Sequence, residues 1–284
     1  MTDKEILILG AHGQLGKALQ KHYPRAIAID SDMLDISNQE AVSKYDFSSI
    51  KYILNAAAYT NVDGAETTEG RRTAWQVNAI GPRNLAYAAQ KNDITLVHIS
   101  TDYVFDGTND SHTEEEVFSP LSVYGSSKAA GDIVIELLPK HYILRTSWVI
   151  GDGKNFVRTM LEVGKKGVTP SVVSDQIGRL TFTDELTRCI DHLLTSNPGY
   201  GTYNVSNDGP AGSWADITRK IFEIAGYTNK VSNINTGKYY EGKVGVAQRP
   251  LKSTLDLSKL KATNFQPIDW EKGLVDYVSK EVDI

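Results

Sequence analysis

The chain alternates between short apolar runs and longer segments in which apolar side chains recur every three or four positions. Five apolar runs lie at 5–9, 26–29, 52–55, 96–99 and 142–146. Runs of this length that end at glycine or polar residues are typical of strands buried on both faces of a parallel sheet. The segments between them show helical spacing, as at Leu15, Leu19 and Tyr23. The pattern predicts an α/β fold with a doubly wound parallel sheet.

The first predicted strand leads into a loop with glycines at positions 10, 13 and 16, within which a helix begins. Glycines allow a tight turn and a close approach of the backbone to a pyrophosphate, and the free N–H groups of a helix start attract an anion. The spacing is G-x-x-G-x-x-G, whereas the usual dinucleotide fingerprint is G-x-G-x-x-G. The loop by itself fits a plain turn as well as a phosphate cradle.

Asp30 ends the second predicted strand, about twenty residues after the first glycine. An acidic residue at this position receives the ribose hydroxyls of an adenosine. Because a carboxylate repels a 2′-phosphate, Asp30 favours NADH over NADPH. The next segment predicts a helix with Ser37 as its N-cap and Glu40 completing a capping box.

Polar residues follow the fourth predicted strand. Ser100 and Thr101 end it, and Tyr124 and Lys128 lie four residues apart at the start of a predicted helix, so they share one helical face. An ammonium close to a phenol lowers the phenol pKa from about 10, which suits proton transfer near neutral pH. The ends of strands one, four and five converge in a doubly wound sheet, so we expect the pair beside the glycine loop. His98, on the strand itself, is predicted to be a core histidine.

Composition narrows the classes of partner and compartment. The 284 residues include 30 Lys and Arg and 35 Asp and Glu, a formal charge of −5 without a basic run, which argues against nucleic acid. The single cysteine, Cys189, cannot form an intramolecular disulfide, and its position predicts a buried helical thiol. The chain shows neither a bilayer-spanning apolar stretch nor a secretory signal. We expect a cytoplasmic protein that binds neither nucleic acid nor membrane.

The second half of the chain is less regular. Apolar spacing predicts helices over 183–194 and 214–225, and 202–206 is predicted to be a further strand. We expect a dinucleotide-binding domain over 1–150, to which segments near 175–206 return. The rest of 151–284 is expected to form a smaller C-terminal substrate-binding lobe.

The glycine loop, the Ser100-Thr101 strand end and Tyr124-x-x-x-Lys128 resemble the extended short-chain dehydrogenase/reductase superfamily. More narrowly, the chain is similar to the family of dTDP-4-dehydrorhamnose reductases over nearly its whole length. The narrower resemblance rests on 55–66, 100–107, 144–149, Asp175-Gln176, Arg249-Pro250 and Leu255-Asp256. It implies a Rossmann-like fold and NADPH- or NADH-dependent reduction of the 4-keto group of dTDP-4-dehydro-L-rhamnose to dTDP-L-rhamnose.

The resemblance also implies three sets of site residues. The catalytic set is Thr101, Tyr124 and Lys128. The cofactor set contains Tyr124 and Lys128 together with Gly10, Gly13, Gln14, Leu15, Gly16, Asp30, Asp35, Ile36, Ala57, Ala58 and Tyr59. The substrate set is Ser100, Thr101, Asp102, Tyr124, Trp148 and Arg249.

Metal binding is not expected. Some members of the family dimerise around Mg²⁺ through a glutamate of the first helix, but the aligned residue here is Ala18. The six histidines also show no ligand spacing. A monomer and a homodimer both stay open, and a Mg²⁺-bridged dimer is not expected.

Two other functions stay open. A 4,6-dehydratase or epimerase of the same superfamily resembles Thr-Asp-Glu at the strand end; here Tyr103 replaces the glutamate, whereas Asp102 remains. The second alternative is a non-catalytic subunit that resembles the regulatory partner of methionine adenosyltransferase. The presence of Thr101, Tyr124 and Lys128 together favours the reductase.

Overall fold

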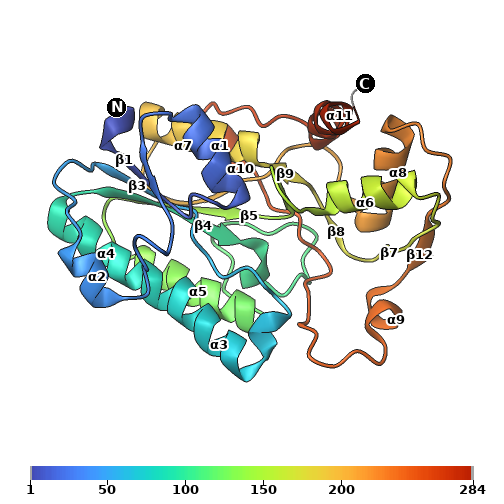
Figure 1. The fold of residues 1–284 in the computed structure, drawn as a ribbon, viewed down its shortest axis with the longest axis horizontal. Coiled ribbons are helices and arrows are strands. Elements are labelled where there is room, and N and C mark those ends of the chain that lie inside the picture. The colour runs from blue at the N-terminus through green and yellow to red at the C-terminus, as the bar shows by residue number, and fades with distance from the viewer. Residues whose placement is uncertain (1, 283–284) are drawn as a thin grey trace.

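The computed structural model describes residues 2–282, and a sheet of six parallel strands forms its centre (Figure 1). The strand order is β10-β5-β4-β3-β1-β2. The strands are β1 (Ile6–Leu9), β2 (Ile27–Ile29), β3 (Tyr52–Asn55), β4 (Thr95–Thr101), β5 (His141–Thr146) and β10 (Gly201–Asn204). The doubly wound parallel sheet predicted from the apolar runs is therefore confirmed, and the predicted strand at 202–206 forms its edge.

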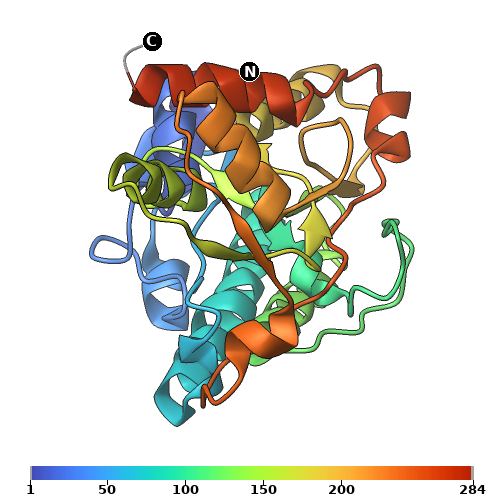
Figure 2. The same ribbon diagram turned by 90° about the vertical axis from the view of Figure 1, so that its right-hand side faces the viewer.

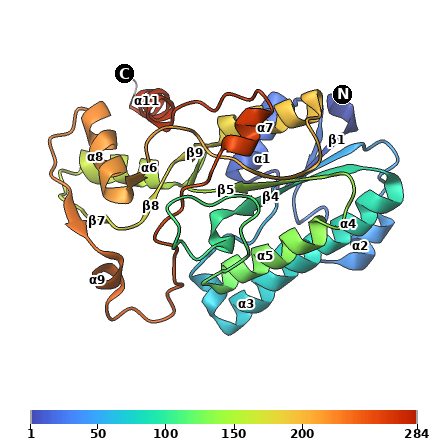
Figure 3. The same ribbon diagram turned by 180° about the vertical axis from the view of Figure 1, so that it is seen from behind.

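Helices cover both faces of this sheet, which explains why the central strands are apolar on both sides. One face packs against α1 (Gln14–His22) and α7 (Thr183–Ser196). The opposite face packs against α2 (Gln39–Lys44), α4 (Gly81–Asn92) and α5 (Val123–Ile135), with α3 (Thr68–Trp75) beside them (Figures 1 and 3). All four side chains of β1 are buried between the two layers.

Chain order reverses between β1 and β3, which lie side by side although β2 comes between them in sequence. At such a position, the connections that follow the two neighbouring strands run to opposite faces of the sheet. A crevice forms between them at the carboxyl ends of the strands. Gly10 follows β1 and Ala56 follows β3, so the glycine loop lies at this crevice.

The helix after β2 begins later than the sequence predicted. The N-cap of α2 is Asn38, whose side chain accepts a hydrogen bond from the N–H of Ala41 at 3.0 Å. Ser37 instead donates to the carboxylate of Asp35. The prediction of Ser37 as N-cap is wrong because Ser37 is held in a turn by Asp35, which leaves the adjacent asparagine to cap the helix.

A smaller lobe packs beside the carboxyl ends of the strands, and Figure 2 shows the molecule from that side. Its apolar core includes Val157, Ile221, Trp270 and Leu274. Its elements are β6 (Val149–Ile150), α6 (Phe156–Lys165), β7 (Ser171–Val173), β8 (Ile177–Gly178), β9 (Thr181–Phe182), β11 (Gly212–Ser213), α8 (Trp214–Ile224), β12 (Ser232–Ile234), α9 (Thr236–Tyr240) and α11 (Trp270–Glu281).

Three segments of the second half pack on the large sheet. α7 covers one face, β10 pairs with β5, and α10 (Ser258–Ala262) contacts β10. Cys189 of α7 is fully buried and its thiol is free, as predicted. Within residues 2–282, we find no helix with the length and apolar character required to cross a membrane.

Candidate active site

The glycine loop after β1 is shaped by close backbone contacts. Gly10 has φ +81°, and a Cβ atom there would lie 2.7 Å from the backbone nitrogen of Ala57. A Cβ on Gly16 would collide with the carbonyl oxygen of Gly10. Gly13 is the N-cap of α1, so the first N–H groups of this helix face the loop. These glycines allow the close backbone packing that brings the helix start to the crevice.

The residues predicted around the riboses lie at the same edge of the sheet. The carboxylate of Asp30 accepts hydrogen bonds from the N–H groups of His12 at 2.9 Å and Ser31 at 2.8 Å. Partial burial acts to raise the pKa of Asp30, but these hydrogen bonds outweigh burial and lower it. Asp30 is therefore anionic and fixed beside the glycine loop.

The loop after β3 is held by Asn78. The side chain of Asn78 accepts from the N–H of Tyr59 at 2.8 Å and donates to the carbonyl of Tyr59 at 3.0 Å. It also donates to Ser127 of α5 at 3.1 Å. Asn78 is buried in a π-helical segment, Gln76–Ile80, a feature frequent at functional sites. The residues predicted to contact the cofactor, 57–59, are thus tied to the helix that carries Tyr124 and Lys128.

One hydroxyl and one carboxylate cap the first turn of α5 and fix where this helix begins. Ser122 accepts from the N–H of Gly125 at 3.1 Å, and Glu66 accepts from the N–H of Val123 at 2.9 Å. Acidic groups at a helix N-terminus also complement the helix dipole. Tyr124 therefore starts from a fixed first turn. The sequence did not single out Glu66 for this role, although it closes the resembling segment 55–66.

Tyr124 lies next to the polar end of β4. Burial raises the pKa of its phenol; a hydrogen bond with Thr101 acts to lower it, whereas the Asp102 and Asp132 carboxylates raise it further. The sequence predicted that Lys128 lowers the pKa of Tyr124. Among the described residues, no such effect of Lys128 is found. Tyr124 is accordingly a protonated phenol at neutral pH.

Lys128 is buried, with 2% of its surface exposed. Its Nζ donates to the carbonyl oxygen of Ile99 at 2.5 Å and lies 3.4 Å from Nε2 of His98. Burial lowers the pKa of Lys128 to about 8, and the Asp132 carboxylate acts in the opposite direction. The ammonium is therefore held against β4. His98 is fully buried, so the prediction of a core histidine is confirmed.

Thr101 ends β4, and its hydroxyl donates to Oδ1 of Asp102 at 3.0 Å and accepts from the N–H of Tyr103 at 3.2 Å. Donation to a substrate therefore requires rotation of this hydroxyl. Burial raises the pKa of Asp102 to about 6, although hydrogen bonds from Ser253 and Thr101 oppose the rise. Ser100, predicted to bind substrate, is also buried here.

Trp148 and Arg249 lie where the lobe meets the sheet. Trp148 has φ +46° and stacks on Trp214, with ring centroids 3.7 Å apart. Arg249 pairs with Asp63 at 2.9 Å and lines a pocket of about 310 Å³. This pocket also contains Tyr103, Phe156, Met160, Gln176, Trp214, Tyr239 and Tyr240. The sequence did not identify this aromatic wall, because its residues are far apart in the chain and show no periodic pattern.

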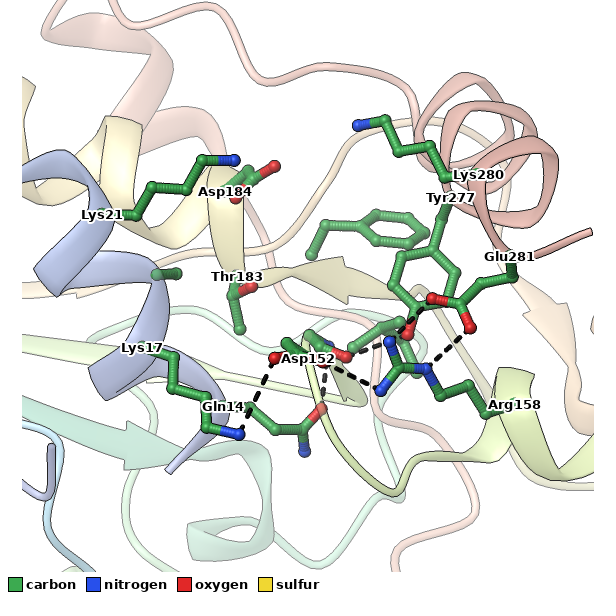
Figure 4. A pocket seen from close by; sticks show the side chains of 14 residues that line it. Gln14, Lys17, Lys21, Asp152, Arg158, Thr183, Asp184, Tyr277, Lys280 and Glu281 are labelled. Atoms are coloured by element: carbon green, nitrogen blue, oxygen red, sulfur yellow. Dashed lines mark hydrogen bonds and ion pairs between the residues drawn. The ribbon is translucent and has the colours of Figure 1, made fainter. Parts of the chain in front are cut away.

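A second pocket, of about 350 Å³, lies between α1, α6, α7 and α11 (Figure 4). Arg158 bridges Glu281 at 2.7 Å and Asp152 at 3.0 Å (Figure 4). Gln14, predicted to hold the pyrophosphate, accepts the N–H of Gly151 at 2.8 Å through its Oε1, which links α1 to the lobe. Ala18 lines this pocket, whereas Thr101, Tyr124 and Lys128 do not.

Residues 4–282 match the family described as RmlD substrate binding domain. The chain is 38% identical over 291 residues to a dTDP-4-dehydrorhamnose reductase of Aggregatibacter actinomycetemcomitans, over 95% of this chain and 96% of that protein. A crystal structure of a dTDP-4-dehydrorhamnose reductase from Clostridium acetobutylicum gives a TM-score of 0.91 at 38% identity and covers 97% of this chain and 99% of its own. The Bacillus anthracis reductase in complex with NADP gives 0.89 at 38% identity, with 99% of both chains covered.

Proposed function

Because this chain belongs to the RmlD substrate binding domain family, we propose that it reduces the 4-keto group of dTDP-4-dehydro-L-rhamnose to give dTDP-L-rhamnose. One observation carries the proposal: a half-buried tyrosine and a buried lysine on α5 lie beside the end of β4 that carries Thr101, at the sheet edge that also carries the glycine loop. A proton donor next to a nucleotide crevice is what a nicotinamide-dependent carbonyl reduction requires.

The crevice fits a nicotinamide dinucleotide, since backbone contacts that exclude a side chain at Gly10 and Gly16 place the free N–H groups of the α1 start at the carboxyl ends of the strands. Bound there, NADPH or NADH supplies the hydride. Gly10, Gly13, Gln14, Leu15 and Gly16 hold the pyrophosphate, with Leu15 acting through its backbone because its side chain is in the core. Asp30, Asp35, Ile36 and Ala57 to Tyr59 surround the riboses. Asp30 favours NADH, whereas the B. anthracis relative carries NADP.

Tyr124 protonates the alkoxide that develops at the sugar C4 oxygen. Its raised pKa keeps the proton on the phenol until that oxygen becomes basic. Lys128 holds the nicotinamide ribose through its buried ammonium. After its hydroxyl rotates away from Asp102, Thr101 donates to the same oxygen and stabilises charge that appears only in the transition state.

The aromatic pocket beside Tyr124 receives the dTDP-sugar. Trp148, fixed by Trp214, lies beside the sugar. Ser100 of β4 and Asp102, in the 3-10 turn that follows β4, contact the sugar. Arg249 carries the charge expected to meet the diphosphate. The cofactor domain is assigned to 1–150 with α7 and β10 added, and the remaining residues to the substrate lobe. The buried free thiol of Cys189 is consistent with a cytoplasmic location.

A coupled assay tests the function by supplying 4-keto sugar nucleotides with NADPH and NADH in turn. We expect one equivalent of reduced cofactor to be oxidised for each dTDP-L-rhamnose formed. Product without net cofactor consumption would indicate a dehydratase or epimerase. Stoichiometric capture of a methionine adenosyltransferase, without reductase turnover, would indicate a regulatory subunit.

A further inference from the structure

Three ionisable side chains follow one another along the inner face of α5. Tyr124, Lys128 and Asp132 are spaced four residues apart, so each lies one helical turn from the next. Lys128 is 2% exposed and Asp132 is fully buried. The mechanism uses the first two of these side chains. The third, a buried carboxylate behind the lysine, has no part in it so far.

His98 of β4 lies between Lys128 and Asp132. The side-chain oxygen of Asn55 accepts from the N–H of Ala57 at 3.2 Å, so its nitrogen faces Nδ1 of His98 at 3.0 Å. Nδ1 must then accept, which places the ring proton on Nε2. Nε2 is 3.4 Å from Nζ of Lys128 and 4.0 Å from Oδ1 of Asp132. Burial lowers the pKa of His98 well below its ordinary value, so the imidazole is neutral.

Asp132 is fixed in place by Arg145 of β5. The guanidinium Nε lies 3.1 Å from Oδ2 of Asp132, and both side chains are almost completely buried. Arg145 is itself held by the carbonyl oxygen of Glu114 at 2.9 Å and by the carboxylate of Glu136 at 3.4 Å. Arg145 therefore holds Oδ2 of Asp132, whereas Oδ1 lies 4.0 Å from Nε2 of His98.

The groups that face Lys128 from the surrounding elements differ in charge. From α5 they are the neutral phenol of Tyr124 and the carboxylate of Asp132. From β4 they are the neutral ring of His98 and the carbonyl of Ile99, and from β5 Arg145 lies behind Asp132. Burial disfavours the ammonium of Lys128, and the Asp132 carboxylate is the charged group that favours it.

We propose that Asp132 is a positioning residue of the reductase, which keeps Lys128 protonated and in place against β4 at the pH of catalysis. The role of Asp132 in catalysis rests on the proposed function. The electrostatic coupling between Asp132 and Lys128 does not depend on that function. Burial raises the pKa of Asp132, and the cation of Arg145 acts in the opposite direction and favours its carboxylate form. The arrangement places the carboxylate of Asp132 behind a lysine that burial pushes towards its neutral form.

The test replaces Asp132 by Asn and follows the titration of Lys128 directly. In protein with isotope-labelled lysine side chains, the Lys128 resonance is assigned by its loss in Lys128→Met and titrated by NMR without cofactor. We expect the midpoint in Asp132→Asn to fall by about one pH unit. The alkaline limb of the kcat/KM profile should move in the same direction.

Glu136→Gln is the matched control, because Glu136 also binds Arg145 but lies one turn further from Lys128. In Glu136→Gln, the titration midpoint of Lys128 should equal that in the unmodified protein. An unchanged midpoint in Asp132→Asn, or an equal shift in Glu136→Gln, would overturn the proposal. If Asp132→Asn does not fold, the double variant Asp132→Leu with Arg145→Met removes the buried pair together and is judged by the same midpoint. Absence of turnover in the unmodified protein would refute the reductase function alone, since the NMR midpoints are independent of it.

Discussion

At the scale of single residues, the site separates two ionisable groups whose pKa values move in opposite directions. Burial raises the pKa of Tyr124 and lowers that of Lys128 to about 8. Each shift favours the neutral form, as desolvation requires. The phenol therefore keeps its proton over the working pH range, and the ammonium is the group whose charge depends on pH.

Tyr124→Phe should reduce kcat by about 100-fold or more, since it removes the positioned proton donor and keeps the ring. Cofactor affinity, measured by fluorescence titration, should stay near that of the unmodified protein. Tyr142→Phe is the matched control: it also removes a buried tyrosine hydroxyl, one that donates to Leu193 at 3.2 Å away from the site. Equal loss of turnover in both variants would contradict the assignment.

Activity should fall as pH rises through about 8, because Lys128 loses its charge there. Stability should change in the other direction. The unfolded chain keeps this proton up to about 10.5, so it binds more protons than the folded chain between the two values, and the contribution of Lys128 makes the fold more stable as pH rises. The pH profile of kcat/KM for the cofactor tests the first effect. A profile that stays flat to pH 10 would exclude Lys128 as the controlling group.

At the scale of elements, α1 depends on contact between the glycine loop and its first turn. Gly16→Ala should destabilise the protein by about 1–3 kcal/mol and weaken cofactor binding, because the new methyl group collides with the carbonyl of Gly10. Gly237→Ala is the control, since Gly237 is also helical but has an open surrounding. That variant should be neutral or slightly stabilising. Urea unfolding measures the stability of each variant, and cofactor titration measures its affinity for the cofactor. Comparable losses in Gly16→Ala and Gly237→Ala would contradict the steric explanation.

The elements that the sequence predicted well are those with a periodic signal. The central strands and the helices α7 and α8 follow from apolar spacing, and the catalytic set stays a prediction that the resemblance implies through its motif. The network of His98, Asp132 and Arg145 could not be predicted, because it joins β4, α5 and β5 through side chains without sequence periodicity. For the same reason the π-helical segment that carries Asn78 has no signal in apolar spacing.

At the scale of the whole molecule, Asp63 connects the large sheet to the lobe. Its carboxylate accepts from the N–H of Ala247 at 3.0 Å and binds the guanidinium of Arg249 at 2.9 Å. This contact fixes the end of the segment 241–249, where Arg249 lines the aromatic pocket. Both partners lie in segments that carry the family resemblance, but their pairing across 186 positions needed the structure.

Asp63→Asn should raise KM for the sugar nucleotide about tenfold and leave kcat within about twofold, because it weakens a charged hydrogen bond that positions Arg249. Steady-state kinetics at saturating cofactor measure this split. Asp93→Asn serves as the control, since it removes a carboxylate from an exposed ion pair with Lys140 outside the pocket. A fall in kcat at unchanged KM would show that Asp63 acts in some other way.

The position of β10 at the edge of the sheet has a consequence for synthesis on the ribosome. β5 ends at Thr146, but its outer neighbour is made only when Asn204 has been added. At about 5–20 residues per second the nascent chain waits several seconds with that strand edge unpaired, and the face that α7 covers stays open for almost as long. Such edges are prone to pair with other chains. Chaperone binding during translation should therefore concentrate in the interval between these two strands.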